Sequence, residues 1–270
     1  MASIDRTAYL RFKRVVSGRE LVEAFTPTPA EITWARGKTQ NDQHLLALVV
    51  RPKSYQRLLL PVFAALPQPL ALLEVGAAAG LGLYPYRYTY RYGDHEIGTG
   101  GPVLDCALTG TAPPARLPEV VWRAGLDLNP LRVTDPADVA WLEALIWPEH
   151  HHRRERLRAA AAVAAADPPI LVRGDLVVDL PALAARAPAD ATLVVFHTSV
   201  LYQVPAERRQ AFASLVRDLP GHWISVEAPD VLRHGTLPPA PDQAAHNVLA
   251  LDGVPLAWTR SHGQAMAWFG

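Results

Sequence analysis

The stretch Leu70-Ala-Leu-Leu-Glu-Val-Gly-Ala-Ala-Ala-Gly-Leu-Gly82 decides the fold of this chain. Its first half is apolar without alternation and stops at a glycine, a pattern that predicts a strand buried on both faces. Gly76 and Gly80 permit a tight turn and a close approach of the backbone to a ligand. The stretch therefore predicts the first strand and turn of an α/β sheet that binds a nucleotide-like ligand.

The acid before the first glycine separates two classes of ligand. Ala78 occupies the middle glycine position of the dinucleotide fingerprint Gly-x-Gly-x-x-Gly, so that fingerprint is not met. The carboxylate of Glu74 suits an ammonium group better than a pyrophosphate. The turn formed by Glu74, Gly76, Ala78 and Gly80 therefore favours S-adenosylmethionine over NAD as the cofactor.

The composition excludes several functions. At 270 residues the chain can form one large domain, and its 26 basic residues balance its 26 acidic residues. This balance provides no charge for binding nucleic acid or an anionic membrane surface. No apolar stretch reaches the roughly 18 residues of a membrane span, and the single Cys106 excludes an intrachain disulfide. We therefore expect a cytoplasmic protein with no membrane or nucleic-acid partner.

Short apolar strands alternate with helical stretches beyond Gly82, which is the signature of a doubly wound α/β sheet. The expected strands are 70–75, 119–125, 170–173, 192–197, 222–227, 247–251, 255–259 and an edge strand at 264–269. The expected helices of this region are 135–145, 149–166, 180–187 and 206–219. Asp252-Gly253 predicts the hairpin that joins the strands on either side of it.

The expected domains are a helical N-terminal cover at 1–68 and a Rossmann-like domain at 69–270, with a β insertion at about 84–118. Tyrosines at every second residue from Tyr84 to Tyr92 predict a strand with a tyrosine face. Pro85 limits any helix after the glycines to about one turn. The tyrosine face is interpreted either as sheet packing or as an aromatic wall that attracts a sulfonium cation near the cofactor.

Four segments resemble the cofactor contacts of class I methyltransferases: 74–80, 125–130, 173–176 and 194–202. The resemblance implies that Asp127, with Leu128 beside it, bonds the ribose hydroxyls. It also implies that the loop of Asp175 and Leu176 meets the adenine. A carboxylate can accept two such hydroxyl bonds, each contributing roughly 1.5–3 kcal/mol.

The chain also resembles a more specific group. Glu74-Val-Gly-Ala-Ala-Ala-Gly-Leu, the Arg-Tyr-x-Tyr-x-x-Gly strand at 87–93, and Arg123-Ala-Gly-Leu-Asp-Leu-Asn-Pro are similar to an uncharacterised bacterial family, known as a domain of unknown function. The resemblance covers roughly residues 70–227. It implies a class I methyltransferase-like fold and no particular reaction.

Three polar residues are candidates for catalysis. His197 ends an apolar strand and is interpreted either as a general base that orients the substrate or as a core histidine bonded to backbone. Tyr202 has the same two interpretations, and Glu227 lies at another strand's carboxyl end. The consecutive histidines 150–152 cannot all face one metal from a helix, so no metal is expected.

The predicted function is transfer of a methyl group from S-adenosylmethionine to an oxygen or nitrogen of a small molecule. One alternative is a protein that keeps the fold without catalysis and serves as a binding or partner subunit. A NAD-type oxidoreductase is the other alternative. The expected partners are a small-molecule substrate and, as an open alternative to a monomer, a second copy of the chain in a homodimer.

Overall fold

The computed structural model describes residues 55–98, 100–144, 146, 150–260 and 263–270. Contacts divide the chain into two compact units, one of residues 1–52 and 135–157 and the other of residues 53–134 and 158–270. The first unit contributes α5 (Pro136–Ala144) and the start of α6 (His151–Ala166), which continues into the second unit. Most of the predicted helical N-terminal cover, residues 1–54, lies outside the described residues.

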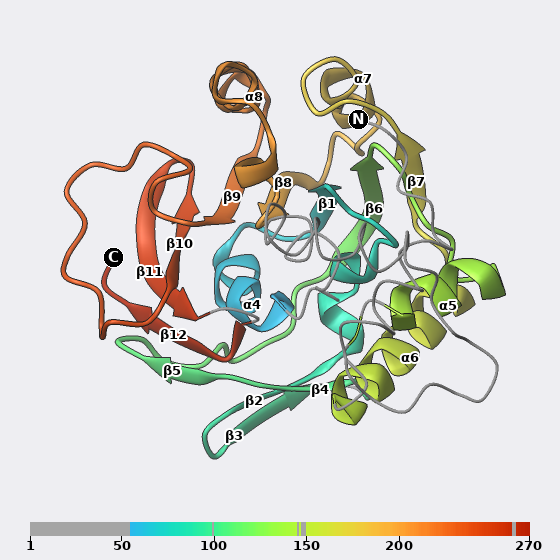
Figure 1. The fold of residues 1–270 in the computed structure, drawn as a ribbon, viewed down its shortest axis with the longest axis horizontal. Helices are drawn as coiled ribbons and strands as arrows, with labels where there is room; N and C mark the ends of the chain where they lie inside the picture. The colour runs from blue at the N-terminus through green and yellow to red at the C-terminus, as the bar shows by residue number, and fades with distance from the viewer. Residues whose placement is uncertain (1–54, 99, 145, 147–149, 261–262) are drawn as a thin grey trace, which may run out of the picture. The chain divides into compact units, whose positions relative to one another are not determined.

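The second unit is built on a nine-stranded sheet in the order β5-β12-β11-β10-β9-β8-β1-β6-β7 (Figure 1). Its parallel part consists of β7 (Ile170–Arg173), β6 (Val120–Asp127), β1 (Leu70–Val75), β8 (Thr192–Thr198) and β9 (His222–Glu227). The antiparallel part consists of β10 (His246–Leu251), β11 (Val254–Arg260) and β12 (Ala265–Trp268). A mixed α/β class with a large, mostly parallel sheet is thereby confirmed.

Every strand expected from the apolar runs is present in this sheet, with ends within a few residues of the prediction. One strand was not expected: β5 (Ala107–Thr109) leaves the insertion and pairs in parallel with β12 at the edge. Its three residues are too short to give a periodic signal, so the sequence could not separate it from a loop.

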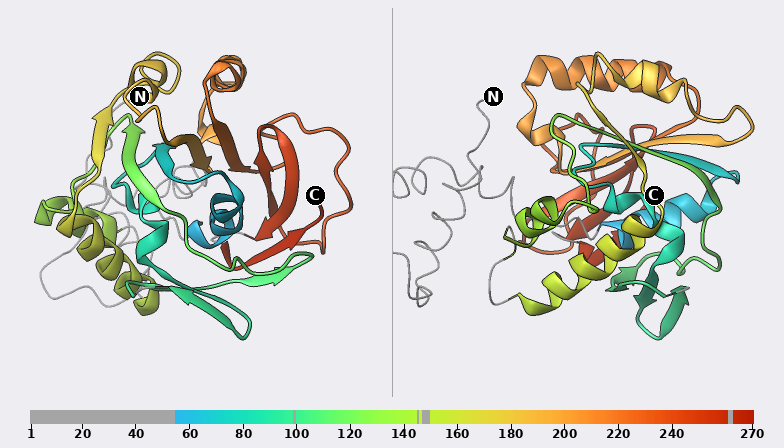
Figure 2. Two further views of the ribbon diagram at one scale, coloured as in Figure 1. Left: turned by 180° about the vertical axis from the view of Figure 1, so that it is seen from behind. Right: turned by 90° about the vertical axis from the view of Figure 1, so that its right-hand side faces the viewer.

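The two faces of the sheet carry separate hydrophobic cores. The first core includes Leu70 and Leu72 of β1 and is covered by α4 (Gln56–Ala65), whose Phe63 meets Phe196 of β8 edge to face at 5.4 Å. The second core includes Leu73 of β1 and is covered by α7 (Leu180–Ala184) and α8 (Ala206–Asp218). Figure 2 shows α4 on one side of the sheet and the pair α7 and α8 on the other. Alternate residues of each inner strand therefore face different cores.

The turn after β1 contains no full helix. A single 3-10 turn, Leu81–Leu83, follows Gly80, and a second one, Pro85–Arg87, follows directly. The expectation that Pro85 shortens any helix here is confirmed. The expectation of one strand from Tyr84 to Tyr92 is wrong for its first half, because the fixed φ of Pro85 starts a turn instead.

The strand begins only at Thr89. β2 (Thr89–Tyr92) and β3 (His95–Gly98) form a hairpin around Gly93-Asp94, and β4 (Val103–Asp105) pairs in parallel with β2 on its other side. This three-stranded sheet is separate from the large sheet.

Four tyrosines of the insertion are buried and bind backbone carbonyls with their hydroxyls. Tyr84 donates to Asp167 at 2.6 Å, Tyr88 to Leu81 at 2.7 Å, Tyr90 to Pro85 at 2.8 Å and Tyr92 to Arg57 at 2.6 Å. Each side chain thus fills the first core, and its buried hydroxyl has a backbone acceptor. Of the two interpretations of the tyrosine face, the structure supports packing.

None of the helices in the described ranges is both long and apolar enough to cross a bilayer.

The buried tyrosines generate a prediction about alkaline pH. Burial raises the pKa of Tyr84 to about 12, against the opposing charge of Arg123, and raises the pKa values of Tyr88, Tyr90 and Tyr92 further. In the unfolded chain these groups titrate near 10. Their stabilisation is therefore complete below pH 10 and is lost as the pH rises through the folded-state values, which for Tyr84 means between pH 10 and about 12.

The test follows tyrosinate absorbance and circular dichroism in one alkaline titration. We expect the four tyrosines to ionise late and together with unfolding, and Tyr90→Phe to remove one late-ionising group. Ionisation of all tyrosines near pH 10 in a chain that is still folded would contradict the prediction.

Candidate functional site

The strand order reverses at β1. The chain runs from β1 to β6 on one side and later returns to β8 on the other side. In an open parallel sheet, ligands bind outside the carboxyl ends of the strands at such a reversal. The loops that follow Val75, Asp127 and Thr198 therefore enclose the candidate site.

The loop after β1 winds tightly, with φ of 68° at Gly76, 51° at Ala78 and 68° at Gly80. A Cβ on Gly76 would lie 2.6 Å from a methyl of Val200, so this glycine allows the loop after β8 to pack against the end of β1. The conformation of the loop is thus explained by packing within the fold, whether or not a ligand is bound.

The amides of this loop serve the fold. Gly76 N donates to the carbonyl of Leu126 at 2.7 Å, Ala78 N to the carboxylate of Asp127 at 2.8 Å and Gly80 N to the carbonyl of Ala77 at 2.8 Å. A pyrophosphate site needs such amides directed at the ligand. The engaged amides therefore disfavour NAD-type binding here.

Asp127 joins the loops after β1 and β6. One carboxylate oxygen accepts the Ala78 amide and the other accepts the Asn129 amide, both at 2.8 Å. A carboxylate has about four acceptor positions, and Asp127 is only partly buried, so acceptor capacity remains. Its neighbour Leu128 leaves 64% of its surface exposed.

Glu74 lies near the end of β1 with 2% of its surface exposed. Its carboxylate lies against Gly82, where a Cβ would meet the two oxygens at 2.6 and 2.7 Å. Glu74 alternates with Leu73 and so faces the first core, as Leu72 does. Asp127 faces the same side, because its neighbour Leu126 belongs to the second core. The structure therefore brings Glu74 and Asp127 to one face of the sheet on adjacent strands.

Asp175 forms a turn ahead of α7. Its carboxylate accepts the amides of Val177 at 2.8 Å and Val178 at 3.2 Å and pairs with Arg208. Partial burial opposes ionisation, but these bonds outweigh it and lower the pKa of Asp175. Leu176 beside it packs partly buried against the second core. Both residues have a structural explanation, and their contact with an adenine stays a prediction.

His197 and Glu227 lie on the opposite face, against the second core. His197 is 0% exposed and lies between the rings of Phe212, edge to face at 5.4 Å, and Trp223, stacked at 5.9 Å. Its Nδ1 bonds Oε1 of Glu227, itself 1% exposed, at 2.8 Å. The structure thus brings two of the three predicted catalytic residues together, but across the sheet from Glu74 and Asp127.

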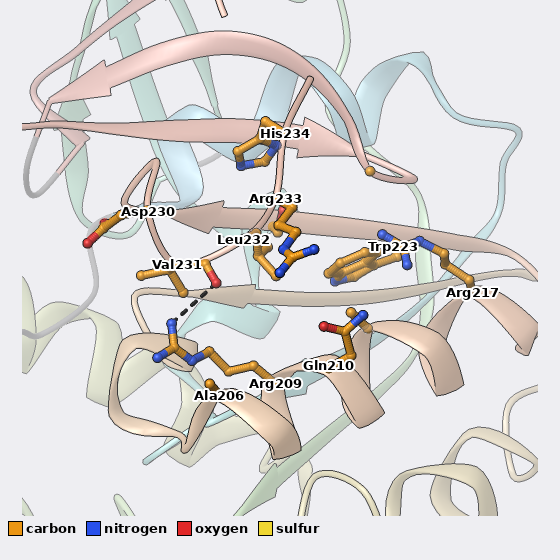
Figure 3. Close-up of a pocket in the computed structure, with 13 residues that line it drawn as sticks. Ala206, Arg209, Gln210, Arg217, Trp223, Asp230, Val231, Leu232, Arg233 and His234 are labelled. Carbon is orange, nitrogen blue, oxygen red and sulfur yellow. Dashed lines mark hydrogen bonds between the residues drawn. The ribbon is translucent and has the colours of Figure 1, made fainter. Parts of the chain in front are cut away.

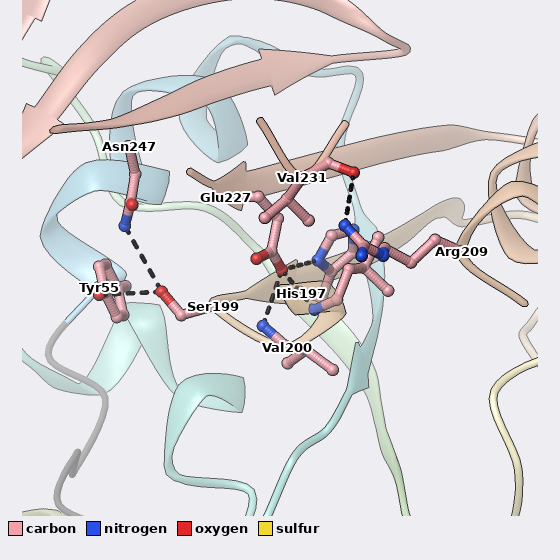
Figure 4. A network of polar contacts seen from close by, with 9 residues as sticks. Tyr55, His197, Ser199, Val200, Arg209, Glu227, Val231 and Asn247 are labelled. Atoms are coloured by element: carbon pink, nitrogen blue, oxygen red, sulfur yellow. Dashed lines mark hydrogen bonds and ion pairs between the residues drawn. The ribbon is translucent and has the colours of Figure 1, made fainter. Parts of the chain in front are cut away.

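Glu227 organises the loop after β8 (Figure 4). The oxygen that binds His197 also accepts the amides of Val200 at 2.7 Å and Leu201 at 3.0 Å. Ser199, which precedes them, has φ of 50°, and its hydroxyl lies 3.1 Å from the hydroxyl of Tyr55. One buried carboxylate therefore holds a strained turn at the reversal point.

Tyr202 lies on the 3-10 turn Leu201–Gln203 that this carboxylate starts, and it is partly exposed. Of the three predicted catalytic residues it is the one with access to solvent. The described residues contain no group of three or more histidine, cysteine or acidic side chains suited to a metal ion.

A second set of residues was missed by the sequence reasoning. A cavity of about 300 Å³ lies between α8 and residues 230–234, with Trp223 and several arginines in its wall (Figure 3). The available signal was the spacing on α8, where Ala206, Arg209, Gln210, Ala213 and Arg217 fall on one helical stripe. The sequence analysis predicts the helix and assigns no function to this stripe.

The three bonds to one oxygen of Glu227 predict a large effect of truncation. Glu227→Ala leaves His197 and two buried amides without their acceptor, and we expect it to lower the free energy of unfolding by about 3–5 kcal/mol. Glu227→Gln keeps an acceptor oxygen and should cost about 1–2 kcal/mol. Urea unfolding measures both. Equal stabilities of the wild type and the alanine variant would contradict this account of the turn.

The close approach of Gly82 to Glu74 predicts a difference between two glycines. Gly82→Ala has an unstrained φ but pushes a methyl against the carboxylate, and we expect a loss of about 1–3 kcal/mol. Gly235→Ala is the matched control, because nothing lies within 4 Å of its added methyl, and it should change stability by less than about 0.5 kcal/mol. Thermal unfolding of both variants tests this difference. Equal losses of stability in the two variants would mean that the loss comes from replacing any glycine and not from contact with Glu74.

Comparison with known proteins gives a strong match to one family model and a weak similarity to one solved structure. A co-crystal structure of WbdD with the kinase inhibitor LY294002 is similar over 84% of this chain and 38% of that chain, at 14% sequence identity and a TM-score of 0.29, a likeness too weak to indicate a shared fold. No curated protein matches the sequence. The family model described as an uncharacterized protein conserved in bacteria (DUF2332) matches residues 49–268. That range includes the whole of the large sheet and the loops at its reversal point, and the chain belongs to this bacterial family, DUF2332.

Proposed function

We propose that the chain binds S-adenosylmethionine and transfers its methyl group to an oxygen or nitrogen of a small molecule. The observation that carries the proposal is the placement of Glu74 and Asp127 on one face, at the ends of adjacent strands next to the strand-order reversal. Both acids are residues that the sequence pattern at the strand ends predicts as cofactor contacts. The class I methyltransferase type of the fold is part of the same proposal.

The chemistry of these residues fits the parts of the cofactor. Asp127 keeps acceptor positions after binding two amides, as a ribose diol requires. The exposed side chain of Leu128 offers an apolar surface beside it for a planar base. The carboxylate of Glu74 supplies the negative charge that an amino-acid ammonium needs.

The bound cofactor would supply an electrophilic methyl group, and the protein would act mainly by positioning. His197 is enclosed on the opposite face, so we assign it to positioning, through the turn that Glu227 holds. Tyr202 lies on that turn and is partly exposed, and we propose that its hydroxyl orients the acceptor or takes its proton.

A second candidate, binding without catalysis, is favoured by the same burial of His197. The hydrogen bond between His197 and Glu227 helps to hold the turn after β8, and this structural role does not require catalysis. A partner or sensor protein could therefore keep the cofactor site and lack turnover. A NAD-dependent reaction is disfavoured by the engaged loop amides.

Calorimetry with S-adenosylmethionine, S-adenosylhomocysteine and NADH separates these functions. We expect both sulfur compounds to bind at micromolar to low millimolar concentrations and NADH not to bind. Methyl transfer to any member of an acceptor panel supports the enzyme, whereas binding without turnover supports the second candidate. Failure of both sulfur compounds to bind would overturn the proposal.

Two variants test the nucleoside contacts. Asp127→Asn removes the charge that strengthens hydroxyl bonds, and Leu128→Ala removes the exposed apolar side chain; we expect affinity losses of at least tenfold and about threefold to tenfold. Val254→Ala is the matched control, since Val254 is 60% exposed at the start of β11 and away from the reversal point. Unchanged affinity in Asp127→Asn would refute the ribose assignment.

A further inference from the structure

A cavity of about 300 Å³ lies on the α8 side of the sheet, over β9. Trp223 and Ser225, alternate residues of β9, form one wall, and Arg209, Gln210 and Arg217 of α8 form the opposite wall. The segment that follows β9 closes a third side. At this volume the cavity suits a small metabolite rather than a large cofactor.

The wall is unusually positive for a chain with no net charge. Arg217 and Arg233 both line the cavity, and neither forms an ion pair with a carboxylate in the described part of the chain. Arg217 lies over the ring of Trp223 at 5.4 Å from its centre. Figure 3 shows the guanidinium groups of Arg217 and Arg233 near opposite ends of that ring. Asp230 is the one carboxylate in the wall, so positive charge is in excess.

Arg209 has a different function. It donates to the carbonyl of Val204 at 2.9 Å and to the carbonyl of Val231 at 3.3 Å, and so fastens α8 to the segment after β9. This bond holds two walls of the cavity in place. The fold therefore fixes the positions of α8 and of the segment after β9, on which the exposed side chains of Arg217 and Arg233 are carried.

Hydrogen-bond donors around the cavity also lack acceptors. Nε1 of Trp223 is buried and has no hydrogen-bond partner among the described residues, and neither ring nitrogen of His234 has one there. Buried polar groups in folded proteins are nearly always bonded. Because these nitrogens have almost no accessible surface, they would reach a ligand only after a shift of their side chains, and the two arginines are the donors that an anion with several oxygen atoms would meet directly.

We propose that this cavity binds a small dianionic metabolite, one that carries a phosphate group or two carboxylates. The three guanidinium groups of the lining, those of Arg209, Arg217 and Arg233, stand against the one carboxylate of Asp230 and leave about two positive charges to be balanced. Guanidinium forks match both phosphate and carboxylate oxygens. Trp223 stacks on His197 at 5.9 Å, so the ligand would lie one ring away from the turn held by Glu227. The proposal does not rest on methyl transfer.

The test titrates the full chain with inorganic phosphate and, separately, with succinate, in calorimetry at low salt. We expect at least one of the two to bind at millimolar concentration or tighter and the affinity to fall as sodium chloride is added. Binding of phosphate alone identifies a phosphate ester, and binding of succinate alone identifies a dicarboxylate. Failure of both to bind would overturn the proposal.

Variants locate the binding. Arg233→Gln and Arg217→Gln should each weaken the anion at least tenfold, and the exposed position of Arg233 keeps the fold intact in the first. Arg186→Gln is the matched control. The substitution removes the same charge, and Arg186 is exposed and does not line the cavity. It should change affinity less than twofold. Equal weakening in all three variants would mean a diffuse charge effect and would overturn the proposal.

A spectroscopic signal adds a local readout. The chain has seven tryptophans, so its indole N–H resonances are few enough to assign, with Trp223→Phe identifying the one at the cavity. We expect the Trp223 resonance to shift as the anion is added, and the dissociation constant from this shift to agree with the one from calorimetry. A resonance that does not move while the anion binds would place the anion elsewhere and contradict the site.

Discussion

β1 pairs in parallel with β6 and β8, and none of its six residues is open to solvent. A strand enclosed in this way must send alternate side chains into two different cores. Leu70 and Leu72 enter the core under α4, and Leu73 and Val75 enter the core under α7 and α8. The same alternation continues to the carboxyl ends of the neighbouring strands. The alternation therefore determines which polar side chains lie on the same face of the sheet and can contact one another.

This alternation divides the polar residues into two groups with different surroundings. Glu74 and Asp127 share one face, where the tight loop after β1 joins them to partly exposed residues. His197 and Glu227 share the other face, where aromatic rings enclose them. In the first group Asp127 is partly exposed and keeps acceptor positions beyond its two amide bonds. The second group holds the turn at 199–201, and this structural function explains its geometry without any chemical reaction.

The insertion after Gly80 replaces the helix that usually follows such a loop. Its buried tyrosines donate to carbonyls of α4, of the 3-10 turns and of the segment before β7. Those bonds bring the small sheet and α4 against the first core. The face that carries Glu74 is thereby covered by aromatic packing, and the remaining open edge lies near Asp127 and Leu128.

The sequence by itself determined the strands of the large sheet other than β5, the helices after residue 135 and the shortened turn at Pro85, because apolar runs and proline act within a few residues. It also determined the family and the acids at the ends of β1 and β6. Only the tertiary structure decided that His197 is enclosed and bonded to Glu227, that the tyrosine hydroxyls are used by backbone, and that β5 reaches the sheet edge. It also decided that Arg217, Arg233 and Trp223 surround one cavity. Each of these contacts joins residues that are far apart in the chain. A single sequence does not show which face of the sheet each of these residues occupies, so it could not predict the contacts.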